Sequence, residues 1–170
     1  LFENMNDSTG IAYTLADIGN VYHQYGEFEK ALDYHFRALF LKEYLNDEPQ
    51  IAYSQNAIGM ILSDMEDNTR ALDFFISAMA IYKKHNKALE LANVYSNIGK
   101  VMIRTDRTEE AEMYINRAYE VYKSAQIEYG ESLVLNNLAE LDFKKNALDD
   151  ASKKLELSEE IGLKLNNLEI

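Results

Sequence analysis

Residues 11–47 read IAYTLADIGNVYHQYGEFEKALDYHFRALFLKEYLND, and the same pattern returns 40 residues later, at 51–87, as IAYSQNAIGMILSDMEDNTRALDFFISAMAIYKKHNK. Small residues mark this period through the rest of the chain: they are Gly19, Gly59 and Gly99, followed by Ala31, Ala71, Ala111 and Ala151. A fixed period of this size indicates an array of stacked structural units, in which each unit leaves an apolar face that its neighbour covers.

Each repeat contains two runs of apolar residues at helical spacing. In the first repeat one run includes Ile11, Leu15 and Ile18, and a second begins at Phe28. Glycine inside a helix costs about 1 kcal/mol relative to alanine, so three glycines in phase indicate that the two helices of a repeat cross closely. The pattern predicts an all-α fold of stacked antiparallel helix pairs.

Turn-forming residues separate the two runs of a repeat. Gly26 suits a left-handed C-terminal cap between them, and Asp67 with Asn68, or Asn146, can take this role in other repeats. Pro49 is the only proline and lies close to the first turn of an expected helix, so no helix interior is broken.

The repeats divide the chain without gaps. We expect a single domain, residues 1–170, with repeats at about 8–47, 48–87, 88–127 and 128–167. Residues 1–7, LFENMND, align with LKEYLND at the end of a second helix, which predicts the tail of a preceding helix. Because no initiator methionine opens the chain and no polar capping helix closes it, we expect a segment excised from a longer protein.

Composition limits the class of partner. The chain has 17 basic and 29 acidic residues, a net charge of −12, and no cysteine. This charge disfavours direct binding to nucleic acid, and no apolar run approaches the roughly 18 residues of a membrane span. We therefore expect a protein or peptide partner, no nucleic acid and no membrane insertion in this segment. Cytoplasmic localisation is the expectation, and the periplasmic side of a membrane sensor stays open as an alternative.

The in-phase residues resemble a known family. The matching positions in the first repeat are Leu15, Ile18, Gly19, Tyr22, Ala31 and Ala38. This combination resembles the tetratricopeptide repeat, in a 40-residue variant similar to the repeats of kinesin light chain and of bacterial Rap regulators. The resemblance implies a right-handed superhelical α-solenoid in which the first helix of each pair lines a concave face.

On that resemblance, side chains of the first helices form a binding groove. The candidate contacts to a partner segment are Tyr13, Asn20, Tyr53, Asn56, Met60, Asn93, Asn97, Lys100, Arg104, Asn136 and Asn137. An amide side chain both donates and accepts hydrogen bonds, so the asparagines can hold the backbone of an extended peptide. The asparagines could instead reflect the composition of the chain, or bridge adjacent helices. Lys100 and Arg104 could hold a carboxylate or phosphate, or form a solvated basic spot.

No motif predicts catalysis, a metal or a cofactor. The three histidines, His23, His35 and His85, lack the i, i+4 spacing of a helical metal site, and phosphate loops and hydrolase elbows are absent. We therefore expect a protein that is not an enzyme. The leading hypothesis is a protein- or peptide-interaction module of a larger bacterial signalling or regulatory protein. The alternatives are a receptor for a small signalling peptide, and an architectural spacer or homodimer without ligand.

Overall fold

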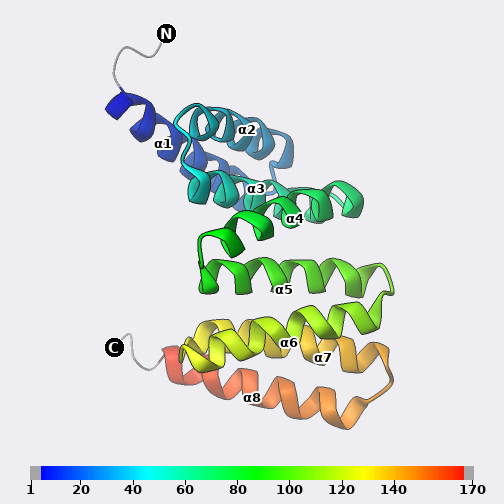
Figure 1. Cartoon of the computed structure of the whole chain (residues 1–170). Helices are drawn as coiled ribbons and strands as arrows, with labels where there is room; N and C mark the ends of the chain where they lie inside the picture. The colour runs from blue at the N-terminus through cyan, green and yellow to red at the C-terminus, as the bar shows by residue number, and fades with distance from the viewer. Residues whose placement is uncertain (1–4, 167–170) are drawn as a thin grey trace. The chain divides into compact units, whose positions relative to one another are not determined.

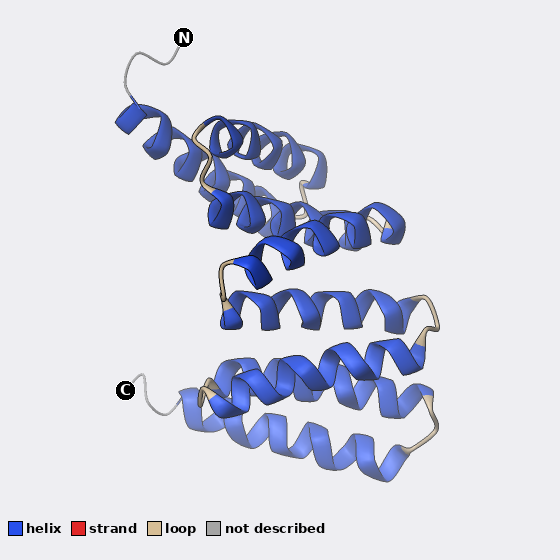
Figure 2. Ribbon diagram, in the orientation of Figure 1, coloured by secondary structure: helices blue, strands red, loops and turns tan. Residues whose placement is uncertain are grey.

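The computed structural model describes residues 5–166, and this part of the chain is helical without a strand (Figures 1 and 2). Its helices are α1 (Met5–Gln24), α2 (Phe28–Tyr44), α3 (Glu48–Asp64), α4 (Asn68–Lys84), α5 (Ala88–Arg104), α6 (Thr108–Ser124), α7 (Glu128–Lys144) and α8 (Leu148–Asn166). The predicted all-α fold of helix pairs is confirmed.

The helices form two compact units, Leu1–Asn86 and Lys87–Ile170, here called the N-terminal and C-terminal units. The N-terminal unit contains the pairs α1/α2 and α3/α4, and the C-terminal unit contains α5/α6 and α7/α8. Inside each unit the second helix of one pair packs against the first helix of the next, α2 on α3 and α6 on α7. Each unit therefore contains two helix pairs and the interface between them.

Every turn between helices has the same backbone geometry, repeated every 20 residues. One residue per turn adopts a left-handed conformation with φ between 53° and 73°: Gly26, Asn46, Glu66, Asn86, Asp106, Gln126 and Asn146. In the turn after α2, Asn46 N donates to Glu43 O and Asp47 N donates to Lys42 O, the paired bonds of a Schellman motif. These bonds close each helix and let the next begin within three residues.

Two predictions about helix ends need correction. The sequence predicts a turn at Asp67 and Asn68, but Glu66 holds the left-handed position, and the Asp67 side chain caps α4 by accepting from Arg70 N at 3.2 Å. Residues 5–7, expected in the tail of a preceding helix, belong to α1, which begins at Met5. The rest of that expected tail, residues 1–4, lies outside the described residues.

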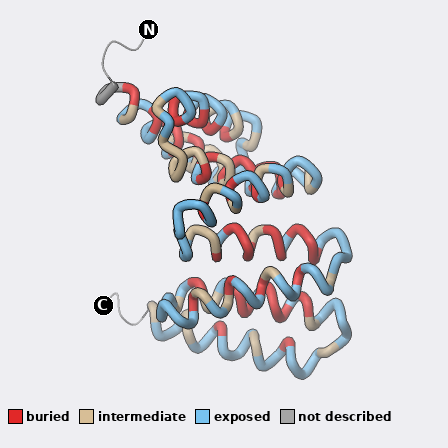
Figure 3. The backbone as a smooth tube through the Cα atoms, viewed as in Figure 1, coloured by how far each residue is buried: buried red, intermediate tan, exposed pale blue. Residues whose placement is uncertain are grey.

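Close helix crossing within each pair occurs at the in-phase glycines. A β-carbon on Gly19 would lie 2.7 Å from the His35 ring, one on Gly59 would lie 2.6 Å from Phe75, and one on Gly99 would overlap Ile115. His35, Phe75 and Ile115 are in phase and buried. Figure 3 shows buried positions recurring along the helices. In the fourth pair Ala139 replaces the glycine, and Leu155, the corresponding large side chain, is 51% exposed.

We predict opposite effects of adding a methyl group at two helical glycines. Gly59→Ala forces the Phe75 ring aside and should lower the free energy of unfolding by about 2 kcal/mol. Gly10→Ala, where nothing lies within 4 Å of the added carbon, should raise it by up to about 1 kcal/mol through helix propensity. Urea unfolding of both variants tests the close crossing, which an equal gain in both would contradict.

His35 is a second feature of the pair interface with a measurable consequence. The residue is fully buried, and neither ring nitrogen has a hydrogen-bond partner. Burial, with the positive charges of Lys42 and His23 as smaller causes, lowers the pKa of His35 from 6.5 to about 4. The imidazole is therefore neutral in the folded protein at neutral pH, as its packing against Gly19 requires.

We predict that His35 makes the fold acid-sensitive. The unfolded chain binds the imidazole proton between about pH 6.5 and 4 while the folded chain does not, so the free energy of unfolding should fall by up to about 3 kcal/mol as the pH drops through this window. His35→Phe, which installs the residue found in phase at position 75, should remove most of this loss. The measurement is urea unfolding at pH 7, 5.5 and 4. Equal pH dependence of the two proteins would rule out His35 as the cause.

Candidate functional site

In the N-terminal unit, two tyrosines and one asparagine form a connected surface on the first helices of its pairs. Tyr13 on α1 and Tyr53 on α3 are 42% and 40% exposed. Asn20 Nδ2 on α1 donates to the Tyr53 hydroxyl at 2.9 Å, which joins α1 to α3. The Tyr53 oxygen accepts this bond, so its own proton is available to an acceptor outside the protein.

A buried lysine lies beneath these two tyrosines. Lys42 extends from α2, is only 2% exposed, and donates from Nζ to Ser54 Oγ at 2.9 Å. Its Nζ is 4.9 Å from the centre of the Tyr53 ring and 5.7 Å from that of Tyr13, within the range of cation–π attraction. Burial is the main cause that lowers the pKa of Lys42 from 10.5 to about 8, while Asp47 and Asp17 oppose the shift.

The remaining candidates in this unit lie on α3. Asn56 is half-buried with Nδ2 3.7 Å from the sulfur of Met60, and Met60 is 38% exposed. Farther along, His23 Nε2 on α1 contacts Asp64 Oδ2 on α3 at 2.8 Å. The candidates of this unit make a polar and aromatic surface that we call the N-terminal first-helix face: Tyr13, Asn20, Tyr53, Asn56 and Met60.

In the C-terminal unit, amides bridge helices. The Tyr122 hydroxyl on α6 donates to Asn93 Oδ1 on α5 at 2.7 Å. Asn137 Nδ2 on α7 donates to Ser96 Oγ on α5 at 2.9 Å, and Asn137 is only 8% exposed. For Asn20, Asn93 and Asn137 the structure therefore shows the bridging role that the sequence left open. Asn137 is buried, so it is not part of a surface.

The other candidates of this unit are accessible. Lys100 and Arg104 are exposed on α5, Asn136 is exposed on α7, and Asn97 is half-buried on α5. Together with Asn93 they define the C-terminal first-helix face: Asn93, Asn97, Lys100, Arg104 and Asn136. The basic residue at the end of the next first helix, Lys144, is paired with Asp106 at 2.5 Å. Lys100 and Arg104 are basic side chains of this face.

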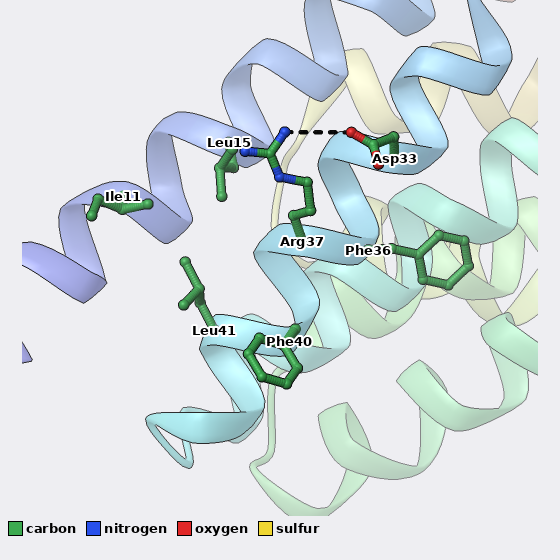
Figure 4. A pocket seen from close by; sticks show the side chains of 7 residues that line it. All are labelled: Ile11, Leu15, Asp33, Phe36, Arg37, Phe40 and Leu41. Carbon is green, nitrogen blue, oxygen red and sulfur yellow. Dashed lines mark hydrogen bonds and ion pairs between the residues drawn. The ribbon is translucent and has the colours of Figure 1, made fainter. Parts of the chain in front are cut away.

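Sequence reasoning missed two features of the N-terminal unit. The first feature is Lys42, which lies in the apolar run of α2 and whose position in the sequence indicated no role. Its ammonium bonds Ser54 on the first helix α3, just as Tyr122, the in-phase residue of the C-terminal unit, bonds Asn93 on the first helix α5. The second feature is a cavity of about 410 Å³ between α1 and α2, lined by Ile11, Leu15, Asp33, Phe36, Arg37, Phe40 and Leu41 (Figure 4). In the sequence, this cavity could have been inferred from Phe36 and Phe40, two phenylalanines on the solvent side of α2.

Two further properties concern residues 5–166. Their histidine and acidic side chains form no group of three or more that could hold a metal ion. None of the helices there combines the length and apolar composition needed to cross a membrane.

We predict that Lys42 titrates near pH 8. Because the unfolded chain keeps the lysine proton up to about pH 10.5 and the folded chain releases it near 8, the free energy of unfolding should rise by up to about 3 kcal/mol between these values. The Lys42 ε-carbon NMR signal gives the midpoint directly, and Lys42→Met, which cannot titrate, should lack this rise. A midpoint near 10.5 would contradict the buried ammonium.

Comparisons with known proteins agree with this architecture. Models described as tetratricopeptide repeat match residues 14–47, 50–124 and 90–164. Curated protein sequences give no match.

Several solved structures have a similar fold. Aspartyl phosphate phosphatase F from Bacillus subtilis matches with a TM-score of 0.82 and 16% identity, over 93% of this chain and 42% of that one. A Rap protein complexed with competence and sporulation factor has a TM-score of 0.85 and 16% identity, over 91% and 44%. A putative kinesin light chain from Podospora anserina has a TM-score of 0.68 and 11% identity, over 92% and 76%.

The chain spans less than half the length of the first two proteins, and at these identities the likeness shows the fold. The repeat models are more specific, because together they match most residues from 14 to 164. The chain belongs to the tetratricopeptide repeat family.

Proposed function

We propose that this chain is the interaction module of a larger bacterial signalling or regulatory protein, and that its first-helix faces bind a partner segment. The observation that carries the proposal is the N-terminal first-helix face, where Tyr13 and Tyr53 are exposed while Asn20 and Lys42 hold them from the side and from below. Side chains fixed by their own contacts lose little entropy when a ligand binds, which favours recognition.

The chemistry of this face suits a peptide backbone. The Tyr53 hydroxyl offers a proton to a carbonyl oxygen, and the tyrosine rings offer apolar area for the chain between its polar groups. The ammonium of Lys42 beneath the rings opposes the approach of a cationic side chain. We therefore expect a neutral or acidic segment at this face.

The C-terminal first-helix face adds positively charged side chains to this proposed binding of a partner segment. Lys100 and Arg104 lie one helical turn apart on α5, both exposed, with Asn93 and Asn97 on the preceding turns. A guanidinium and an ammonium at this spacing suit a carboxylate on the partner. Both faces thus favour an acidic or neutral segment, although the chain as a whole is acidic.

A receptor for a small signalling peptide is the second candidate. The observation that favours it is the fold similarity to a Rap protein complexed with competence and sporulation factor. In that case a free peptide alone would occupy the first-helix face, without a partner protein. Thermal unfolding with signalling peptides alone tests this candidate: the unfolding temperature should rise with peptide concentration, and the absence of a rise would count against a receptor.

We predict that groove substitutions weaken selected peptides. Peptides are selected from a random display library on the intact chain, and their affinity is measured by fluorescence polarisation. Tyr53→Ala with Asn20→Ala, and separately Lys100→Glu with Asn97→Ala, should each lower the affinity at least tenfold for peptides bound at that face.

The matched control is Lys123→Glu, which makes the same charge change on the second helix α6, where Lys123 is exposed. It should leave the affinity within about twofold. If selected peptides bind all the variants equally well, the first-helix faces are not the binding surface. If Lys123→Glu matches the loss in the Lys100 variant, net charge and not the C-terminal face explains that loss.

A further inference from the structure

The cavity between α1 and α2 lies on a different surface from the first-helix face. Leu15 lines the cavity and follows Tyr13 by two residues, which turns it by about 200° around the helix axis. The cavity opens at Ile11, Phe36 and Phe40, which are 45%, 44% and 62% exposed. Exposed phenylalanines at the mouth of a hollow are typical of an interaction site more than of a closed core.

One cation borders this apolar hollow. The Arg37 guanidinium pairs with Asp33 at 3.4 Å (Figure 4). It also lies 5.2 Å from the centre of the Tyr34 ring. Arg37 is therefore held at the rim by one carboxylate and one aromatic ring. The ion pair is exposed, so the second face of the guanidinium can receive another ring.

The repeat itself shows which group fits this position. Eighty residues later the C-terminal unit has tyrosine, Tyr95, in phase with Leu15, while Tyr114 and Arg117 are in phase with Tyr34 and Arg37. Tyr95 is 7% exposed, its ring centre is 5.7 Å from that of Tyr114, and Arg117 Cζ is 5.9 Å from both ring centres.

Arg117 thus lies near the rings of Tyr95 and Tyr114, and Arg37 lies near that of Tyr34. The Tyr34 ring also stacks on Tyr22 at 5.3 Å, so the difference between the units that matters here is at the arginine. In the C-terminal unit the chain supplies the second ring itself, from position 95, and in the N-terminal unit Leu15 borders the cavity together with Arg37. A cation at the rim complements the negative face of an aromatic ring and gains nothing from an aliphatic group of the same shape. The cavity volume of about 410 Å³ is ample for such a ring.

We propose that the α1/α2 cavity is a docking pocket for an aromatic side chain of a partner polypeptide, which packs on Leu15 beneath Arg37. This surface lies apart from the N-terminal first-helix face, and the proposal does not depend on the function proposed for the first-helix faces. The partner residue is phenylalanine or tyrosine, because its ring takes the place that Tyr95 fills in the C-terminal unit.

The test uses the intact chain and soluble aromatic probes. Methyl-labelled Ile11, Leu15 and Leu41 report binding by NMR. The two probes, benzyl alcohol and cyclohexylmethanol, share a six-membered carbon ring and a hydroxymethyl group, but only benzyl alcohol has a planar aromatic ring. Benzyl alcohol should shift these methyl signals with a Kd on the order of 1 mM, and cyclohexylmethanol should bind at least threefold more weakly. N-acetylphenylalaninamide, which carries the ring on a peptide backbone, should bind at least as well as benzyl alcohol.

Two reciprocal variants place the ring in one unit or remove it from the other. Leu15→Tyr fills the pocket as Tyr95 does and should reduce benzyl alcohol binding at least tenfold without loss of thermal stability. Tyr95→Leu should create a second benzyl alcohol site, reported by methyl signals of the C-terminal unit. Arg37→Gln should weaken benzyl alcohol about threefold and leave cyclohexylmethanol unchanged.

Three outcomes would overturn the proposal. Equal binding of the two matched probes shows an unselective apolar hollow. Binding of benzyl alcohol without N-acetylphenylalaninamide shows a site for a small molecule, closed to a side chain on a polypeptide. Full benzyl alcohol binding by a folded Leu15→Tyr variant shows that the probe lies elsewhere. If the Leu15→Tyr variant does not fold, Arg37→Gln still decides aromatic selectivity.

Discussion

The packing of one large side chain on one glycine is the contact on which the fold depends. Phe75 on Gly59 and Ile115 on Gly99 lie in separate units but have the same spacing of 16 residues and the same lack of room for a β-carbon. This contact sets the distance between the two helices of a pair, and the helix that follows packs on the surface so formed. The fourth pair shows the dependence: Ala139 replaces glycine, and Leu155 is half exposed.

The turns allow this contact to recur, since each reverses the chain in three residues. Their left-handed position is glycine only at Gly26, and elsewhere it is asparagine, aspartate, glutamate or glutamine. Glu66 and Gln126 adopt this conformation at a cost of about 1 kcal/mol each, because the backbone bonds of the Schellman motif and helix packing on both sides outweigh the local preference. The turn is therefore specified by the helices it joins more than by its own residues.

The difference between contacts within a helix pair and contacts between pairs determines how far the sequence predicts the structure. Glycine spacing reports a contact between two helices of one pair, so the period and the helix pairs follow from the sequence alone. The surface depends on contacts between pairs, which periodicity does not contain. Asn136 and Asn137 are neighbours of identical type, yet one is exposed and the other is buried against Ser96 on a different helix. Lys42 fits an apolar helical pattern because the aliphatic part of its side chain can be buried like that of leucine. The location of its ammonium follows only from the structure, which places it next to Ser54 and the two tyrosine rings.

The in-phase positions 42 and 122 show how identical scaffolds acquire different surfaces. Lys42 and Tyr122 both extend from a second helix to a first-helix face, where Lys42 lies under Tyr13 and Tyr122 bonds Asn93. Both side chains are buried and long, but one delivers an ammonium and the other a hydroxyl. Leu15 and Tyr95 are also in phase, and Leu15 lines a cavity while Tyr95 is a buried ring. Chemical differences between repeats are thus introduced where a helix junction tolerates a change of side chain, whereas glycine is kept at the close crossings of the first three pairs.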